Sequence, residues 1–128
     1  LTVDELPAAW NELYKKYLGI DVPDDARGVL QDMHWADGAF GYFPSYALGT
    51  AYSAQFMAAL TRELDVNACI ARGDLSPVKQ WLTEKIYRHG MLLTADELLR
   101  GATGESFAPH YYVDYLTEKY TGLYGVNV

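Results

Sequence analysis

The stretch from Tyr46 to Leu64, YALGTAYSAQFMAALTREL, constrains the fold of this chain more than any other. Its residues are apolar or small on nearly every side until Thr61, and a helix of that kind has to be enclosed by other helices. Small residues such as Gly49, Ala54 and Ala58 allow neighbouring backbones to approach closely. We therefore expect a central helix that other helices surround.

Further helix signals lie on both sides of this stretch. An apolar stripe from Trp10 to Leu18 follows helical spacing and predicts a helix that ends at Gly19. Turn and capping residues predict more helices at residues 26–33, 66–72, 76–89, 94–104 and from Pro109 onward. No segment has the alternating pattern of a strand. We expect an all-α, bundle-like array with one core, and a single helical domain over residues 1–128.

Composition excludes several classes of partner. The net charge is −7, with 17 acidic against 10 basic residues, which opposes binding to nucleic-acid phosphates or anionic lipid. No apolar run is long enough to span a membrane, and the N-terminus lacks the basic and apolar regions of a signal peptide. The only cysteine, Cys69, cannot form an internal disulfide, which suits a reducing cytoplasm. Because the first residue is Leu1 rather than methionine, we expect the natural chain to begin further upstream.

The segment from Gly28 to Tyr46, GVLQDMHWADGAFGYFPSY, is the one stretch with the composition of a functional site. It combines a histidine, two carboxylates, three glycines and several aromatic rings. Asp37-Gly38 and Gly41 indicate tight turns, because these residue types tolerate positive φ. A plain helical core does not need this density of polar groups and rings.

The same residues resemble a known family. GVLQDMHW followed by GAFGYFPSYALG closely resembles the carboxy-terminal signature of the carboxypeptidase Taq family of zinc metallocarboxypeptidases. The flanking blocks LPAAWNELYKKYLGI, WLTEKIYRHG, ELLRGATGE and YYVDYLTEKY are similar to family segments in the same order. The resemblance covers essentially the whole chain.

This resemblance implies a cytoplasmic, mostly helical, homodimeric metallopeptidase that removes single residues from the carboxyl end of peptide substrates. The family binds zinc through an HExxH helix and a further glutamate. Those ligands are missing here, because His34, His89 and His110 lie far apart. The chain then corresponds to the C-terminal portion of the enzyme, binds no metal itself, depends on an upstream catalytic part, and is inactive alone.

Four residues are candidates for catalysis within this family. The resemblance implies donors beside the zinc that stabilise the negative oxygen of the tetrahedral intermediate, and removing one such donor costs roughly 2.7 to 4 kcal/mol. His34 is the first candidate and Tyr42 the second, followed by Tyr46; Asp32 either orients His34 or bonds to backbone amides. The alternative is that Asp32 and His34 form a structural pair and the rings fill the core.

A second hypothesis comes from a different class of protein. The chain could be a free-standing helical interaction module that kept the fold without catalysis. If the chain is instead a segment of a larger protein, it should expose apolar surface that meets its missing partner, and we expect the isolated chain to dimerise or to pack tightly in a crystal. Tyrosines at helical spacing near the C-terminus, from Tyr111 to Tyr124, are typical of a core or a subunit contact.

Overall fold

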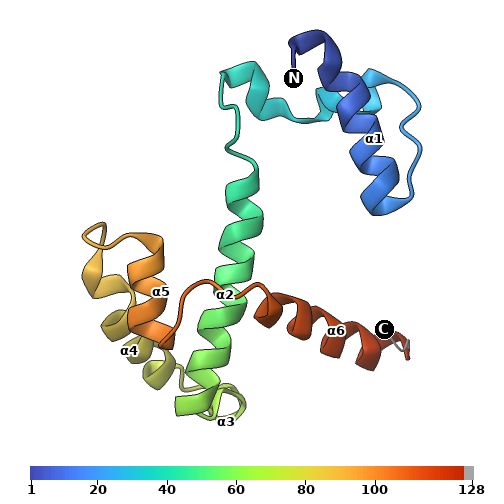
Figure 1. The fold of residues 1–128 in the computed structure, drawn as a ribbon. Helices are drawn as coiled ribbons and strands as arrows, with labels where there is room; N and C mark the ends of the chain where they lie inside the picture. Colours follow the sequence, from blue (N-terminus) through green and yellow to red (C-terminus); the bar gives the residue numbers. More distant parts are fainter. Residues whose placement is uncertain (126–128) are drawn as a thin grey trace. The chain divides into compact units, whose positions relative to one another are not determined.

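A computed structural model describes residues 1–125 of the chain (Figure 1). Within these residues the regular structure is helical throughout, which confirms the all-α class. The chain divides into two compact units, Leu1–Ser45 and a second that begins at Tyr46, and each is described by itself. Whether both belong to one domain of the protein remains a prediction. No helix of the described residues has the length and apolar character needed to cross a bilayer.

The first unit begins with the helix that the apolar stripe predicts. Thr2 and Glu5 form the expected capping box around the short 3-10 turn η1 (Val3–Glu5). Helix α1 (Leu6–Leu18) follows, with a proline in its first turn, and ends at Gly19, which has φ 69. Leu13, Tyr17 and Leu18 are exposed, Trp10 and Tyr14 are partly buried, and none of its residues is fully buried.

The helix expected at residues 26–33 is replaced by three 3-10 turns, η2 (Asp25–Arg27), η3 (Val29–Gln31) and η4 (Met33–Asp37). The reason lies in the residues between them. Gly28 has φ −122 and ψ −119, and Asp32 is extended with φ −79 and ψ 90, so neither continues a helix. The prediction of a helix was wrong here. The predicted turns are confirmed, with φ 73 at Gly38 and 75 at Gly41.

Helix α2 (Pro44–Glu63) is the long helix expected from the central apolar stretch. It is enclosed only from Ala51 onward, where Ala51, Gln55, Ala59 and Leu60 are buried. Residues 44–50 are exposed in this chain. The expectation of a fully surrounded helix is therefore met for part of its length, because the described helices of the second unit pack only on that part.

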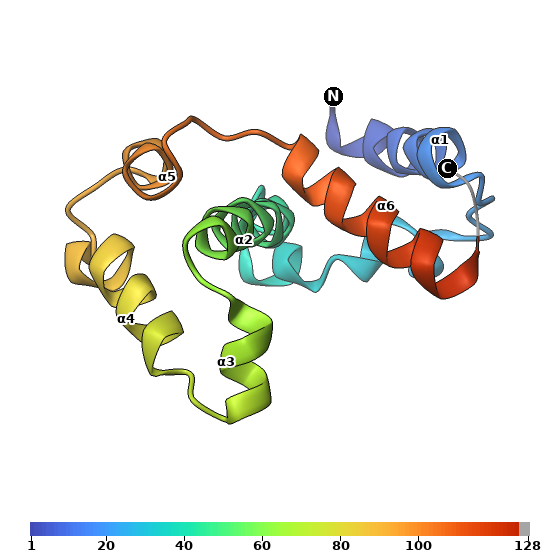
Figure 2. The same cartoon turned by 90° about the horizontal axis from the view of Figure 1, so that it is seen from below.

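The core of the second unit forms where α2 meets α3 (Val66–Arg72), α4 (Ser76–Lys85) and α5 (Ala95–Thr103). Its centre consists of Ala59, Leu60, Trp81 and Ala102. The two views show α4 and α5 on one side of α2 and α6 on the other (Figures 1 and 2). The helix expected to reach residue 89 ends at Lys85, and a 3-10 turn η5 (Tyr87–His89) follows it.

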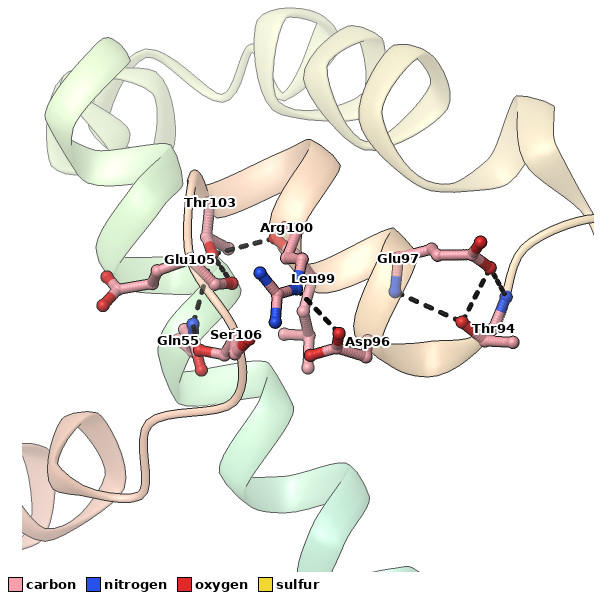
Figure 3. A network of polar contacts seen from close by, with 9 residues as sticks. All are labelled: Gln55, Thr94, Asp96, Glu97, Leu99, Arg100, Thr103, Glu105 and Ser106. Carbon is pink, nitrogen blue, oxygen red and sulfur yellow. Dashed lines mark hydrogen bonds and ion pairs between the residues drawn. The ribbon is translucent and has the colours of Figure 1, made fainter.

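A polar clamp holds the connection between α5 and α6 (His110–Tyr124) against α2 (Figure 3). The Gln55 side chain, 1% exposed, donates to the Thr103 hydroxyl at 3.1 Å and to the Ser106 carbonyl at 3.0 Å. The Ala108 amide donates back to Gln55 Oε1 at 3.0 Å. Phe107 packs edge-on against the Tyr52 ring at 5.0 Å between centroids. The start of α6 is therefore fixed, although α6 itself contains no buried residue.

Candidate active site

The candidate site is built on the 3-10 turn η4, which begins after Asp32. One carboxylate oxygen of Asp32 accepts two hydrogen bonds from His34, from its backbone amide at 3.1 Å and from its ring Nδ1 at 2.8 Å. The amide contact is an N-terminal cap of the turn, since the extended Asp32 places its side chain over the first amides. The Asp32 oxygen that caps the turn is thus also the oxygen that orients the imidazole.

Asp32 therefore makes both of the contacts considered for it from the sequence, one with the His34 ring and one with a backbone amide. The two side chains are partly buried, at 23% exposure for His34 and 11% for Asp32. A carboxylate at Nδ1 selects the tautomer with the proton on that nitrogen and compensates the charge of a protonated ring.

Two aromatic rings flank the imidazole. The Tyr42 ring lies 5.4 Å from the His34 ring between centroids, and the Phe43 ring lies 5.2 Å away, both tilted by about 50°. Tyr42 is 50% exposed in this chain. Sequence analysis selected Tyr42 but not Phe43, and the only signal for Phe43 was its position next to Tyr42.

A second group of rings supports η4 from within the first unit. The Trp35 ring stacks on Phe40 at 5.6 Å and meets the Trp10 ring edge-on at 6.2 Å. Trp10 in turn stacks on Tyr14 at 5.1 Å, which connects η4 to α1. The apolar stripe of α1 therefore also packs against η4, the turn that carries His34.

Close packing at Gly28 explains why the segment begins with glycine. A Cβ at this position would lie 2.6 Å from Val22 Cγ1 and 3.1 Å from the Asp24 carbonyl oxygen. The next residue, Val29, is 4% exposed. The backbone before the site is thus held by contacts that leave no room for a side chain.

Tyr46, the remaining candidate, lies in the second unit near the start of α2, where its carbonyl accepts a hydrogen bond from Thr50 at 2.9 Å. The structure brings together Asp32, His34 and Tyr42 within the first unit. The other histidines lie elsewhere, His89 in η5 and His110 at the start of α6.

Among residues 1–125 no group of three histidine, cysteine, aspartate or glutamate side chains could hold a metal ion. The donors that this part of the chain brings together do not fit a zinc site, and we derive no chemical step through a metal.

Carboxylates with a shifted pKa lie at turns and helix ends away from the candidate site. The Arg27 side chain holds the pKa of Asp24 below its ordinary value, and the Thr94 hydroxyl and amide do the same for Glu97. In both residues the charged form is favoured by hydrogen bonds at an exposed cap. These pKa shifts therefore come from hydrogen bonds that stabilise a turn and a helix end.

The chain matches the family described as carboxypeptidase Taq (M32) metallopeptidase over residues 1–120. It is 47% identical over 125 residues to carboxypeptidase 1 of Bacillus subtilis, covering 97% of this chain and 25% of that protein. The M32 carboxypeptidase structure from Deinococcus radiodurans aligns with a TM-score of 0.88 at 42% identity, covering 98% of this chain and 26% of that one. Metallocarboxypeptidase 1 of Trypanosoma cruzi aligns at 0.85 and 46% identity, over 94% of this chain and 26% of that one. The chain spans about a quarter of the length of the curated relatives that it matches. Because the family match extends over nearly the whole sequence, this chain belongs to the carboxypeptidase Taq (M32) metallopeptidases.

Proposed function

We propose that this chain forms the C-terminal part of a zinc-dependent carboxypeptidase that releases single amino acids from the carboxyl end of peptides. Its match to a quarter of the length of named carboxypeptidases supports this role. The zinc ligands and most of the substrate cleft then belong to the upstream part of the polypeptide. This chain contributes one wall of the cleft. The homodimer and the cytoplasmic location that the family resemblance implies are part of the same proposal.

The observation that carries the proposal is the hydrogen bond between Asp32 and His34 Nδ1 at 2.8 Å, with Tyr42 beside the ring. Peptide hydrolysis places negative charge on the carbonyl oxygen of the tetrahedral intermediate. An imidazole oriented through Nδ1 donates to that oxygen from Nε2 when protonated, and a phenol donates a second hydrogen bond without adding charge. Donors of this type bind the transition state more strongly than the substrate.

Each candidate then has a distinct role. His34 and Tyr42 act on the developing oxyanion, Tyr46 supplies an alternative phenol from α2, and Asp32 is a positioning residue that acts through His34. Tyr42 takes precedence over Tyr46 because its ring contacts the imidazole inside the first unit.

The test uses a chimeric enzyme in which this chain replaces the matching segment of the Bacillus subtilis carboxypeptidase 1. We expect His34→Ala to lower kcat by about 100-fold to 1,000-fold with little change in KM, because the lost hydrogen bond is made in the transition state. His89→Ala is the matched control, since it removes the same ring from η5 in the second unit. A kcat for His34→Ala within a few-fold of the parent would leave the Asp32–His34 pair a structural one.

The isolated chain provides a second, independent test. We expect no release of amino acids from N-blocked peptides by residues 1–128 alone, with or without added zinc, because the described residues hold no metal-binding group. Metal-dependent turnover by this chain alone would contradict the proposal. An inactive chimera with a folded far-UV circular dichroism spectrum would instead favour a helical interaction module.

A further inference from the structure

A groove separates α2 from α6 within the second unit. It has a volume of about 530 Å³ and is lined by one face of α2 from Thr50 to Thr61 and one face of α6 from Tyr111 to Glu118. We call it the α2–α6 groove. Its size is that of a site for several large side chains.

The groove is fixed by contacts behind it. The Gln55 clamp described above holds the chain just before α6 to the buried side of α2 (Figure 3). Arg62 of α2 donates to the Tyr111 hydroxyl at 3.4 Å and to the Thr103 carbonyl at 3.3 Å. The Tyr111 hydroxyl donates in turn to Glu105. The start of α6 is therefore positioned by polar contacts within this chain.

The α2 wall presents an apolar surface despite its hydroxyl groups. Thr50, Ser53 and Thr61 each donate to a carbonyl of the preceding turn of α2, at 2.9, 2.9 and 3.0 Å. Their hydroxyl protons are thus used within the helix, and the residues turn carbon atoms outward. Met57 lies among them with 51% of its surface exposed. This wall suits apolar side chains in a partner.

The α6 wall adds negative charge at the edge. The charged residues that line the groove are Asp114 and Glu118, both exposed and both acidic. If a second copy docked here by two-fold symmetry, the carboxylates of one copy would face the same carboxylates of the other. These like charges would repel each other, in a chain that already has a net charge of −7. An occupant with lysine or arginine beside its apolar side chains fits the edge better.

We infer that the α2–α6 groove binds a segment of the same polypeptide that lies upstream of this chain, with apolar anchors toward Met57 and basic residues toward Asp114 and Glu118. The inference rests on the proposed function. Relatives are about four times as long as the match, so most of such a protein lies outside this chain. The groove is where part of that length buries its apolar surface.

Methionine oxidation tests the inference without a substitution. Met57 and Met91 are both exposed in the 128-residue chain, at 51% and 100%. Dilute hydrogen peroxide, followed by peptide mass spectrometry, should oxidise Met57 in the isolated chain at a rate within about threefold of Met91. In the chimeric enzyme we expect Met57 to react at least about 10-fold more slowly than in the isolated chain.

Groove filling provides the second measurement. Thr61→Trp places a large ring in the groove, and Thr83→Trp is the matched control, because Thr83 is an exposed threonine on α4 whose hydroxyl also donates to its own helix, at 2.8 Å. We expect Thr61→Trp to lower the melting temperature of the chimeric enzyme by about 4 °C or more, and Thr83→Trp to change it by about 1 °C at most. In the isolated chain, both variants should melt like the parent.

Each outcome decides the inference. Equal oxidation of Met57 in both proteins, or an unchanged melting temperature for Thr61→Trp in the chimera, overturns it. Protection of Met57 in the isolated chain that disappears on dilution assigns the groove to a second copy and also overturns it. Activity of the chimera is read separately: an active chimera with a reactive Met57 rejects only the groove, whereas a protected Met57 in an inactive chimera rejects only the proposed catalysis.

Discussion

The two units of this chain are stabilised by different kinds of interaction. The second unit is built from α-helices around a core, and it contains seven of the eight buried apolar residues of the described chain, whereas the first contributes only Val29. The first unit instead places short 3-10 turns, capped by aspartates and flanked by aromatic rings, after a single α-helix. Three of the four residues with candidate chemistry, Asp32, His34 and Tyr42, lie in the unit with the smaller core. Local hydrogen bonds and ring contacts, rather than core burial, position them.

The tryptophans allow the two units to be monitored separately. Trp10 and Trp35 lie in the first unit and contact each other, while Trp81 lies in the core of the second. Unfolding of each unit therefore has its own optical signal. The following predictions use this separation, from the largest expected effect to the smallest.

Trp81→Ala should have the largest effect on the free energy of unfolding. Trp81 is 5% exposed at the centre of the second core, and truncation of such a ring costs about 3 to 5 kcal/mol. Urea unfolding followed by circular dichroism should show this loss, while the fluorescence transition of Trp10 and Trp35 stays unchanged. An equal shift of both transitions would mean that the two units unfold together, and the contrast drawn above would be wrong.

Gln55→Ala tests the polar clamp. It leaves the Ala108 amide and the Ser106 carbonyl without the partner they have in Gln55, at a cost of about 3 kcal/mol in the free energy of unfolding of the second unit. Gln80→Ala is the control, because Gln80 bonds Glu84 on the exposed surface of α4. The control should cost less than about 0.5 kcal/mol, measured in the same urea titration.

Gly28→Ala tests the first unit. The added Cβ meets Val22 and the Asp24 backbone, so we expect a loss of about 2 kcal/mol that appears in the fluorescence of Trp10 and Trp35. Gly49→Ala is the matched control, since a Cβ on that helical glycine meets no atom within 4 Å. The control should be neutral or stabilising by up to about 1 kcal/mol. The same result for both glycines would show that backbone crowding does not hold the site segment.

Thr94→Ala should have the smallest effect. It breaks the capping box of α5 and should cost about 1 kcal/mol. Because the Thr94 side chain and amide lower the pKa of Glu97, the carboxylate contributes stability at neutral pH that is lost as pH falls through the pKa of the folded state. In Thr94→Ala the pKa of Glu97, followed by NMR, should rise toward its ordinary value. An unchanged pKa would assign the shift to another cause.

The local features of this fold could be read from the sequence because each depends on neighbouring residues. Gly19 and Gly73 end helices with positive φ, and Thr94 with Glu97 begins α5, all as expected. The Asp32–His34 contact belongs to the same class, since both residues lie in one turn. Patterns of this kind can be recognised from a few neighbouring residues, without knowledge of the rest of the chain.

The features that were missed depend on distance or on small conformational choices. Gln55 bonds residues 48 to 53 positions away, and no local pattern separates such a clamp from any other glutamine. The series of 3-10 turns depends on backbone angles at Gly28 and Asp32, where the capping residues before them indicated a helix. The exposure of residues 44–50 of α2 was missed for the same reason, because the apolar pattern of a helix does not show what covers it.

The hydrogen bond between Asp32 and His34 spans a single intervening residue, Met33, so the pair forms a local unit of three consecutive residues. Deletion of Met33 alone would therefore remove the contact. Grafting this turn onto another helical scaffold would carry the Asp32–His34 hydrogen bond with it, whereas the scaffold would have to supply the ring contacts that Trp35 makes with Trp10 and Phe40.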